Sequence, residues 1–307
     1  MEDKTLSGLR IGVYGKGGAG KSTVAVFLAT ALQEAGYSVL VLDADSTNYG
    51  LAAALGMDRE PDPLLDHFGG MVFSGGLVTC PVDDPTPLAG ARVQLGQLSP
   101  RFVARGAKGV CLLVAGKLGP LGPGAGCDGP VAKIARDLRV AGLGPHPITI
   151  VDFKAGFEDA ARGALNTVDW AVVVVDPTSA AIQMAHHLAR MVADIRRGTP
   201  PATRHLKDPG LVELAVRLFR EARVRGVSSV LNRVPTAAAE AYLRRTLEGS
   251  GPPVAAVFGD EPAVAEQWLR GQWLHSDRLL DAGRALAREL EQRYRSSMTA
   301  PAMPVEV

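Results

Sequence analysis

Cysteines, net charge and long apolar runs are all scarce in this sequence. Its 307 residues include three cysteines, Cys80, Cys111 and Cys127, an odd number without regular spacing. This pattern argues against a disulfide framework and suits a reducing cytosol. No apolar run approaches the roughly 18 residues that a membrane-spanning helix requires. The first ten residues, MEDKTLSGLR, also lack the apolar core of a signal peptide. We therefore expect a soluble, cytoplasmic protein.

The charges are nearly balanced. There are 33 basic and 32 acidic residues, intermixed along the chain, which gives a formal net charge of +1. Without a broad basic field, neither nucleic acid nor an anionic membrane is a favoured partner. Apolar residues make up 47% of the chain, enough to bury a large core in one or two domains.

Short apolar runs alternate with longer helical patterns along most of the chain. Strands are predicted at residues 9–15, 38–45, 110–116, 148–153, 170–176, 227–234 and 253–259. Helices are predicted at residues 21–35, 130–140, 157–166, 178–197, 210–225, 236–248, 261–271 and 277–295. Several strands are apolar on both faces, as buried parallel strands are. The alternation predicts an α/β fold with a mostly parallel central sheet flanked by helices on both faces.

Two segments interrupt this alternation. Residues 57–109 contain repeated proline and Gly-Gly breaks, and we expect irregular loops there, with an edge hairpin as a further possibility. Loops of this length tend to be functional or mobile. The last residues, 296–307, are expected to form a frayed tail.

A glycine-rich loop joins the first predicted strand to the first predicted helix. Residues 15–22, GKGGAGKS, fit the phosphate-binding pattern G-x-x-x-x-G-K-[ST]. The loop is built from Gly15, Gly17, Gly18, Ala19 and Gly20. Its backbone can bend around phosphate oxygens, and free N–H groups at the helix start favour negative charge. Lys21 can reach the β and γ phosphates, Ser22 can supply a hydroxyl to Mg²⁺, and Thr23 can bond the α phosphate. The alternative is a strand-to-helix turn that binds nothing.

Polar side chains end three other predicted strands. Asp43 and Asp45 lie at the carboxyl end of one strand, where open α/β sheets bind ligands, and their spacing points both side chains the same way. Capping of the following helix is the alternative role for either of them. Asp152 ends a second strand, and Gly156 follows four positions later. Asn232 ends a third strand, where a turn asparagine is the alternative.

The sequence KGGAGKST, residues 16–23, resembles the deviant Walker A motif of the MinD, ParA, nitrogenase iron protein and arsenite-pump ATPases. The resemblance implies a SIMIBI-class P-loop NTPase, with residues 1–307 forming a single ATPase domain. In that family the first lysine crosses a dimer interface and contacts the phosphates bound by the other subunit. It therefore implies a homodimer closed by ATP, with Lys16, Lys21 and Asp45 as catalytic residues. A solvated loop lysine is the alternative for Lys16.

The same resemblance implies roles for the remaining site residues. By analogy, Asp43 helps to hold the Mg²⁺ shell, and Asp45 orients or deprotonates the attacking water. Asp152 resembles the Walker B carboxylate that binds Mg²⁺, usually through water, and Gly156 resembles the switch II glycine whose N–H senses the γ phosphate. Asn232 matches the position where the family reads adenine with a side-chain amide. No guanine-binding NKxD motif follows it, which favours ATP over GTP.

Three longer stretches, residues 42–57, 122–138 and 151–191, resemble the CooC-type ATPases. Those proteins support maturation of nickel-containing carbon monoxide dehydrogenase, and the resemblance implies a client metalloenzyme or assembly factor as partner. The similarity covers most of the chain. It leaves out residues 57–109 and an apparent helical insertion at about 198–226.

One CooC feature is incomplete in this chain. CooC-type proteins carry a Cys-x-Cys motif that binds a metal between subunits, since four thiolates form a tetrahedral soft-metal site. Cys127 matches the first cysteine, but Gly129 stands at the second position. A dimer would contribute two thiolates, with Asp128 as a further ligand. An unligated Cys127 is the favoured interpretation, and a transition metal at a dimer interface is the alternative.

Lys154 is a second departure, because relatives commonly carry acidic or small residues in this part of switch II. Its open partners are Asp43, Asp45, a phosphate or solvent. The sequence alone leaves its role undecided.

The sequence therefore predicts a Mg-ATP-dependent dimeric ATPase switch that supports maturation, metal insertion or activation of a client metalloenzyme. One alternative is a MinD- or ParA-like positioning ATPase, for which the arginines between residues 190 and 225 supply a local basic run. A solvated helix face is the more typical origin of such a run. A second alternative is an iron protein-like ATPase that donates electrons to a reductase. It requires two cysteines per subunit, and Cys111 lies within a predicted buried strand.

Overall fold

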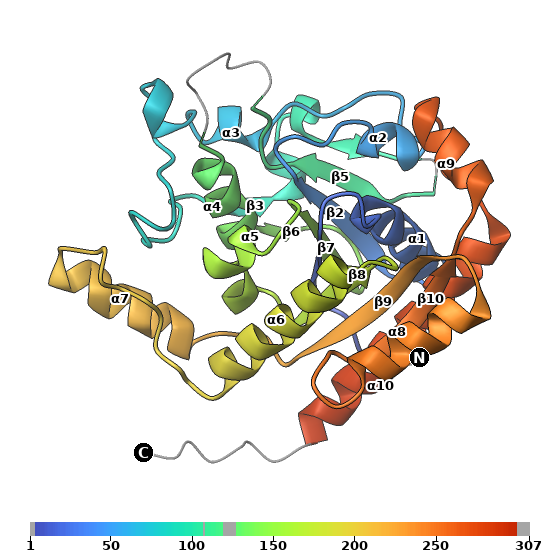
Figure 1. The fold of residues 1–307 in the computed structure, drawn as a ribbon. Coiled ribbons are helices and arrows are strands. Elements are labelled where there is room, and N and C mark those ends of the chain that lie inside the picture. The colour runs from blue at the N-terminus through green and yellow to red at the C-terminus, as the bar shows by residue number, and fades with distance from the viewer. Residues whose placement is uncertain (1–3, 107, 119–126, 300–307) are drawn as a thin grey trace.

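One twisted sheet of eight strands forms the centre of the computed structural model, which describes residues 4–106, 108–118 and 127–299 (Figure 1). The strand order is β10-β9-β8-β1-β7-β2-β5-β4. The strands are β1 (Arg10–Gly15), β2 (Ser38–Ala44), β4 (Ala104–Arg105), β5 (Cys111–Val114), β7 (Pro147–Phe153), β8 (Trp170–Val175), β9 (Gly226–Val234) and β10 (Val254–Gly259). All neighbours pair in parallel except β4 and β5. The predicted mostly parallel α/β sheet is confirmed.

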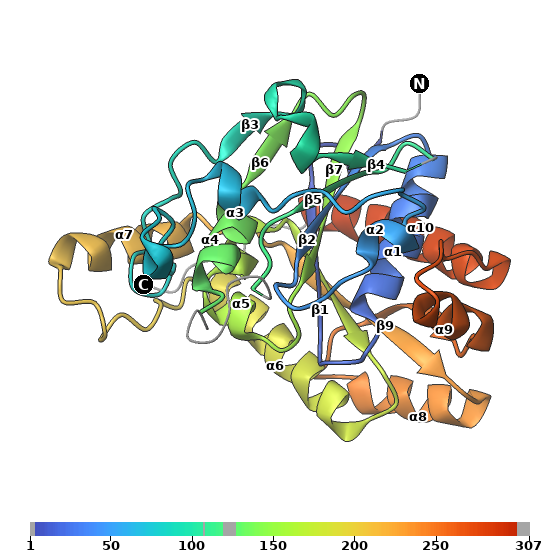
Figure 2. The same ribbon diagram turned by 90° about the horizontal axis from the view of Figure 1, so that it is seen from above.

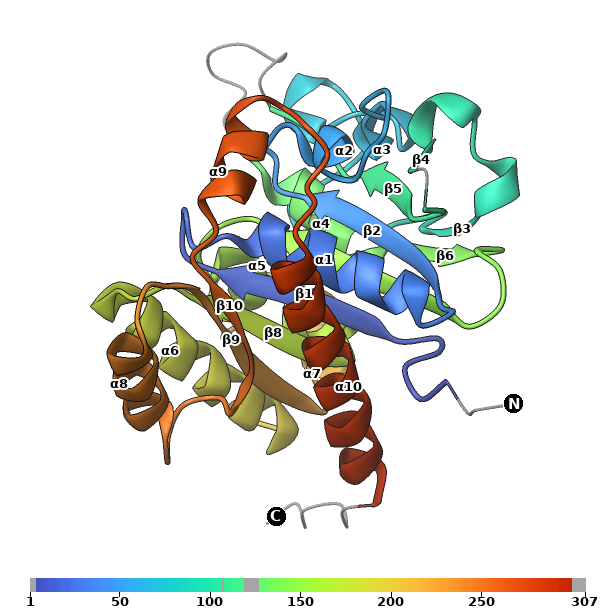
Figure 3. The ribbon, with the colours of Figure 1, turned by 90° about the vertical axis from the view of Figure 1, so that its right-hand side faces the viewer.

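Helices cover both faces of this sheet. Helices α1 (Lys21–Glu34) and α10 (Asp277–Thr299) lie side by side on the face seen in Figure 3. The other face is covered by α4 (Gly129–Asp137), α5 (Glu158–Ala161) and α6 (Ser179–Arg196). The remaining helices are α2 (Leu51–Ala54), α3 (Leu64–His67), α7 (Pro209–Arg220), α8 (Ala237–Leu247) and α9 (Pro262–Leu269).

Alternation along the buried strands divides the interior into two cores. On β2, Val39 and Val41 point into the core under α1, whereas Leu40 and Leu42 point into the core under α4. Both faces of the strand are therefore apolar, which is why the run has no polar alternation in the sequence. Within the described ranges, no helix is both long and apolar enough to cross a membrane.

The irregular segment at residues 57–109 contains more regular structure than the sequence suggested. β4 pairs antiparallel with β5 at the sheet edge, so an edge hairpin is present. A further strand, β3 (Arg92–Gln94), pairs in parallel with β6 (Arg139–Ala141), as Figure 2 shows. The predicted helix at 130–140 is therefore wrong at its end, because Leu138 is extended and the next residues bond to β3.

Three other predicted boundaries also differ. Gly163, at φ 89°, separates α5 from a 3-10 turn at Ala164–Thr167, so the predicted helix at 157–166 is broken. In the predicted insertion at 198–226, the helix stops at Arg220, and α7 extends away from the sheet (Figure 1). Helix α10 runs to Thr299, so residues 296–299 of the expected tail are helical. Residues 300–307 lie outside the described part.

Candidate nucleotide-binding site

The glycine-rich loop lies between β1 and α1 at the carboxyl edge of the sheet. Gly20 has φ 89°, and a Cβ there would overlap the Asn232 side-chain amide. A Cβ on Gly15 would lie 2.9 Å from the Val174 carbonyl oxygen on β8. Both positions exclude larger residues for steric reasons. The loop backbone is therefore free to surround an anion at the start of α1.

The first turn of α1 brings together the residues predicted to bind phosphate and Mg²⁺. Lys21 is buried, and the Ser22 hydroxyl donates to Oδ2 of Asp152 at 2.5 Å. Asn48 Nδ2 donates to the same Ser22 oxygen at 3.0 Å. Thr23 accepts a hydrogen bond from the indole of Trp268 on α9, at 2.9 Å. The structure thus places the Ser22 hydroxyl directly against the Asp152 carboxylate.

A buried lysine that the sequence analysis missed holds the second carboxylate. Asp43 on β2 lies in register with Asp152 on β7, and both are fully buried. Lys117 Nζ is 2.7 Å from Oδ2 of Asp43 and donates to the Asp45 carbonyl oxygen at 2.8 Å. It also donates to the Asn48 carbonyl oxygen. The signal for Lys117 was available, because it follows an apolar strand at the same sheet edge as Asp43.

Burial changes the acidity of both central aspartates. It raises the pKa of Asp152 to about 6, although the nearby Lys21 ammonium acts in the opposite direction. Burial also raises the pKa of Asp43, against the opposing effect of Lys117. Oδ1 of Asp152 is buried and accepts no hydrogen bond within the described structure. An ionised carboxylate with an unpaired buried oxygen fits a bound cation, so this donor set suits Mg²⁺.

Asp45 lies at the same sheet edge, with its side chain turned into the following loop. Its Oδ1 accepts from the Thr47 N–H at 2.9 Å and from the Thr47 hydroxyl at 2.8 Å. This is an Asx turn rather than a helix cap, since the residue that precedes α2 is Gly50. Thr47 therefore fixes one oxygen of the carboxylate proposed to act on water.

Lys16 folds back onto its own chain. Its Nζ is 3.0 Å from Oδ2 of Asp176, the residue after β8, and 3.3 Å from the Gly17 carbonyl oxygen. Its side chain keeps 29% of its surface exposed. Asp176 was not identified from the sequence, although it ends the strand next to β1. Contact between Lys16 and a neighbouring chain would require this ion pair to open.

The segment after Asp152 is tied to the glycine-rich loop and to α4. Gly156, at φ 95°, donates its N–H to the Gly15 carbonyl oxygen at 3.1 Å. Lys154 pairs with Oδ2 of Asp128 at 2.5 Å, rather than with Asp43 or Asp45. Burial would raise the pKa of Asp128, but its ion pairs with Lys154 and Arg162 hold it below the ordinary value. The predicted switch segment is thus linked to the residue that precedes α4.

The segment that carries Cys127 lacks room for a second thiol at position 129. A Cβ on Gly129 would lie 2.6 Å from Sγ of Cys80, which packs against that glycine. Cys127 is half-buried, and its Sγ accepts from the Gly129 N–H at 3.4 Å. Asp128, the further ligand considered, is already ion-paired. Within one chain, no group of three or more His, Cys, Asp or Glu residues in the described ranges is placed to hold a metal ion, so a single chain supplies too few donors at Cys127 for a transition metal.

Two other predicted positions are placed as follows. Cys111 is buried in β5, and Arg105 Nη1 donates to its sulfur at 3.0 Å. Asn232 is buried at the end of β9, and its Nδ2 donates to the Ala19 carbonyl oxygen at 2.7 Å. In this structure the Asn232 amide therefore anchors the glycine-rich loop by a hydrogen bond to its backbone.

Replacing Asp152 with asparagine is expected to stabilise the Mg²⁺-free and nucleotide-free protein at pH 8 by about 3 kcal/mol. Burial raises the pKa of this carboxyl from 3.8 to about 6, so its ionised form destabilises the fold. This destabilisation of wild type by the ionised carboxylate is fully present above about pH 6 and disappears below about pH 4. Urea unfolding of Asp152→Asn and wild type at pH 8 and pH 4 measures it. A variant less stable than wild type at pH 8 would contradict this expectation.

Comparisons with known proteins agree with this geometry. Residues 11–274 match the model of the CobQ/CobB/MinD/ParA nucleotide binding domain. An uncharacterised ATP-binding protein of Methanocaldococcus jannaschii is 30% identical over 58% of this chain and 70% of its own length. The carbon monoxide dehydrogenase accessory protein CooC of Rhodospirillum rubrum is 30% identical over 61% of this chain and 70% of its own.

The fold also matches a solved structure. The septum site-determining protein MinD of Pyrococcus horikoshii, complexed with Mg-ADP, superposes with a TM-score of 0.55. The match covers 95% of this chain and 99% of that one at 18% identity, so it shows a shared fold. Together with the family match over most of the chain, these similarities establish its family. The chain belongs to the CobQ/CobB/MinD/ParA nucleotide-binding domain family.

Proposed function

We propose that this protein hydrolyses Mg-ATP to ADP and phosphate and that ATP closes a homodimer. The observation that carries the proposal is the hydrogen bond from the half-buried Ser22 hydroxyl to the buried Asp152 carboxylate, next to Lys21, with the other Asp152 oxygen unsatisfied in the described structure. Lys21 and Ser22 lie at the start of α1, immediately after the glycine-rich loop. This arrangement supports binding of a triphosphate together with a divalent cation. The Lys21 ammonium would bind the phosphates, and the Ser22 and Asp152 oxygens would bind the cation.

Each residue of the site has a definable role in this reaction. The loop N–H groups and Lys21 would bind the β and γ phosphates, and Ser22 with Asp152 would hold Mg²⁺, with Asp43 in the outer shell. Mg²⁺, when bound, neutralises developing phosphate charge. Asp45 is suited to orient the attacking water, because Thr47 fixes one of its oxygens.

Two further residues would make the site responsive to the nucleotide. The Gly156 N–H now bonds Gly15, and exchange of that bond for a γ-phosphate oxygen would move the segment that carries Lys154. Asn232, whose amide donates to the Ala19 carbonyl oxygen of the loop, would read the adenine base.

We also propose that the switch supports maturation, metal insertion or activation of a client metalloenzyme. The support is the similarity to the Rhodospirillum rubrum accessory protein for carbon monoxide dehydrogenase. Because one chain supplies too few donors around Cys127 for a transition metal, no step of this function is assigned to that cysteine. The client would instead be recognised by the surface that ATP-driven closure rearranges.

The dimer is tested by replacing Lys16 with alanine. Wild type with a non-hydrolysable ATP analogue and Mg²⁺ is expected to elute at twice its 32.2 kDa mass. Lys16→Ala is expected to remain monomeric, with turnover lowered at least about 100-fold, because a cation supplied across an interface stabilises transition-state charge. Light scattering after size exclusion and phosphate release provide the two measurements.

Two variants act as controls for this experiment. Lys207→Ala removes an exposed lysine far from the loop and should match wild type. Asp176→Asn removes the acidic partner of Lys16 and should allow dimers at lower analogue concentration. Full dimerisation and turnover of Lys16→Ala would refute the role of Lys16 across the interface.

A further inference from the structure

The irregular segment at residues 57–109 and the insertion at about 198–226 meet around one cavity. Its volume is about 780 Å³, within the range typical of small-molecule sites. One wall comes from residues 81–92 and the opposite wall from residues 201–223. His205 Nε2 lies 2.9 Å from the Val82 carbonyl oxygen and joins these walls. No residue of the phosphate-binding loop lines the cavity, so it is separate from the nucleotide site.

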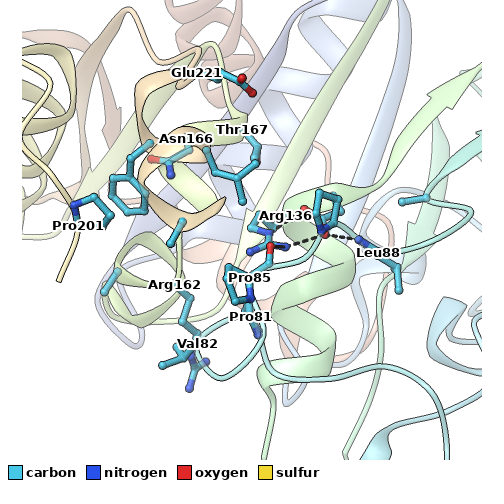
Figure 4. A pocket seen from close by; sticks show the side chains of 18 of the residues that line it. Pro81, Val82, Pro85, Leu88, Arg136, Arg162, Asn166, Thr167, Pro201 and Glu221 are labelled. Carbon is cyan, nitrogen blue, oxygen red and sulfur yellow. Dashed lines mark hydrogen bonds and ion pairs between the residues drawn. The ribbon is translucent and has the colours of Figure 1, made fainter. Parts of the chain in front are cut away.

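Much of the lining is apolar. Helix α7 contributes Ala215, Leu218 and Phe219, which share one helix face, and α6 contributes Met191. Leu218, Phe219 and Met191 are half-buried, so this apolar face is incompletely covered by the protein itself. Figure 4 shows the facing side, where Pro81, Val82 and Pro85 line the cavity. The apolar walls favour an apolar body in the ligand.

The remaining lining is strongly basic. Five arginines and two acidic residues contribute: Arg92, Arg136, Arg139, Arg162, Arg223, Asp137 and Glu221. Asp137 is already paired with Arg136 at 2.7 Å. Arg139 donates to the uncharged carbonyl oxygens of Arg136 and Leu138, at 3.0 and 2.8 Å.

The arginines also repel one another. Burial, together with the neighbouring Arg223 and Arg92, lowers the pKa of Arg139 to about 10, against the attraction of Asp137 and Asp169. Arg223 is paired with Asp169 at 2.8 Å, whereas Arg92 is exposed on β3. An anion at this wall would relieve the repulsion.

A polar group with an unmet hydrogen bond completes the lining. Asn166 follows α5, lines the cavity and is 7% exposed (Figure 4). Its Oδ1 is buried and, within the described structure, has no donor. Such an oxygen favours a ligand that carries an N–H or O–H group.

We propose that this cavity binds a small organic anion with an apolar body and a hydrogen-bond donor. The inference goes beyond the ATPase proposal and is independent of it. The ligand places its apolar part against α7, its negative charge toward Arg92 and Arg139, and its donor toward Asn166. Arg162 in the same wall also holds Asp128, the partner of Lys154, so the occupied cavity adjoins the switch segment.

A fluorescent probe with all three features tests the site. 8-Anilinonaphthalene-1-sulfonate has an aromatic body, a sulfonate and an N–H donor, and N-phenyl-1-naphthylamine lacks the sulfonate. The charged probe is expected to bind the full-length protein at one saturable site, and more tightly than the neutral probe. Fluorescence titration at fixed ionic strength measures both dissociation constants.

Three variants locate the probe. Leu218→Trp places a bulky ring on the apolar α7 wall, narrows the cavity there and should weaken binding of the charged probe at least about 10-fold. Arg92→Gln should weaken the charged probe about 5-fold and leave the neutral probe unchanged, since one exposed charge contributes roughly 1 kcal/mol. Arg217→Gln removes an arginine of α7 that does not line the cavity, and should change binding less than twofold.

Each contrary outcome overturns a defined part of the proposal. Unchanged binding in Leu218→Trp would show that the probe sits elsewhere and would refute the site. Equal effects of Arg92→Gln and Arg217→Gln would refute recognition of the anion by this wall. Thermal melting confirms that the variants fold, and the binding readout does not depend on ATP hydrolysis.

Discussion

Replacing Lys21 with alanine is expected to lower Mg-ATP hydrolysis by roughly 100- to 1,000-fold and to weaken ATP binding. Lys21 is buried in the first turn of α1, where its ammonium is available to the phosphates and lowers the pKa of Asp152. Alanine removes both effects at once. Phosphate release and titration with a fluorescent ATP analogue measure the two losses.

A conservative change separates charge from geometry in this prediction. Lys21→Arg keeps the charge but needs more space, and a Cβ on Gly15 would already lie 3.2 Å from Cγ of Lys21. We expect it to lose most of its turnover as well, because a planar guanidinium does not replace a compact ammonium in a confined loop. Turnover of Lys21→Ala within threefold of wild type would contradict the assignment of the phosphate site.

Replacing Lys117 with methionine is expected to destabilise the protein at pH 9, above the raised pKa of Asp43, by about 3–5 kcal/mol, because it leaves the buried carboxylate without its cation. Asp43 is fully buried and lies 2.7 Å from the Lys117 ammonium. The carbonyl oxygens of Asp45 and Asn48 would lose a donor in the same change. Urea unfolding followed by circular dichroism measures the difference.

The double variant Lys117→Met/Asp43→Asn distinguishes the charge from the packing. It should recover more than half of the lost stability, because the remaining amide is uncharged. Lys108→Met is the matched control, since Lys108 pairs with Glu34 at the surface and should cost less than about 1 kcal/mol. Equal losses in the single and double variants would show that Lys117 acts through packing alone.

The regular elements could be predicted because their signals are local. The apolar runs at β1, β2, β7 and β8 are buried on both faces, and length together with apolar character identifies such strands. β3 and β6 were missed because each has three residues and none of them is buried. Such short, exposed strands need no apolar run or alternation in the sequence. Their pairing joins residues from distant parts of the chain.

The positions of the candidate site residues followed from local sequence better than their partners did. Asp43, Asp152 and Ser22 could be proposed because each stands at a strand or helix end with a recognisable motif, and the structure places all three at one edge of the sheet. The ion pair of Lys154 was left undecided, since several acidic groups were within reach of any plausible topology. Only the position of α4 beside the switch segment selects Asp128.

By itself, the sequence determined the phosphate-binding loop and the family. A tight turn with glycines, a strand before it and a helix after it are neighbours in the chain, so their geometry follows from local conformation. Tertiary structure alone decided which polar and charged groups meet. Lys117 and Asp43 are 74 residues apart, and Asn232 and Ala19 are 213 apart. Such contacts depend on strand order, because β2 lies between β5 and β7, and burial then makes an unpaired charge costly.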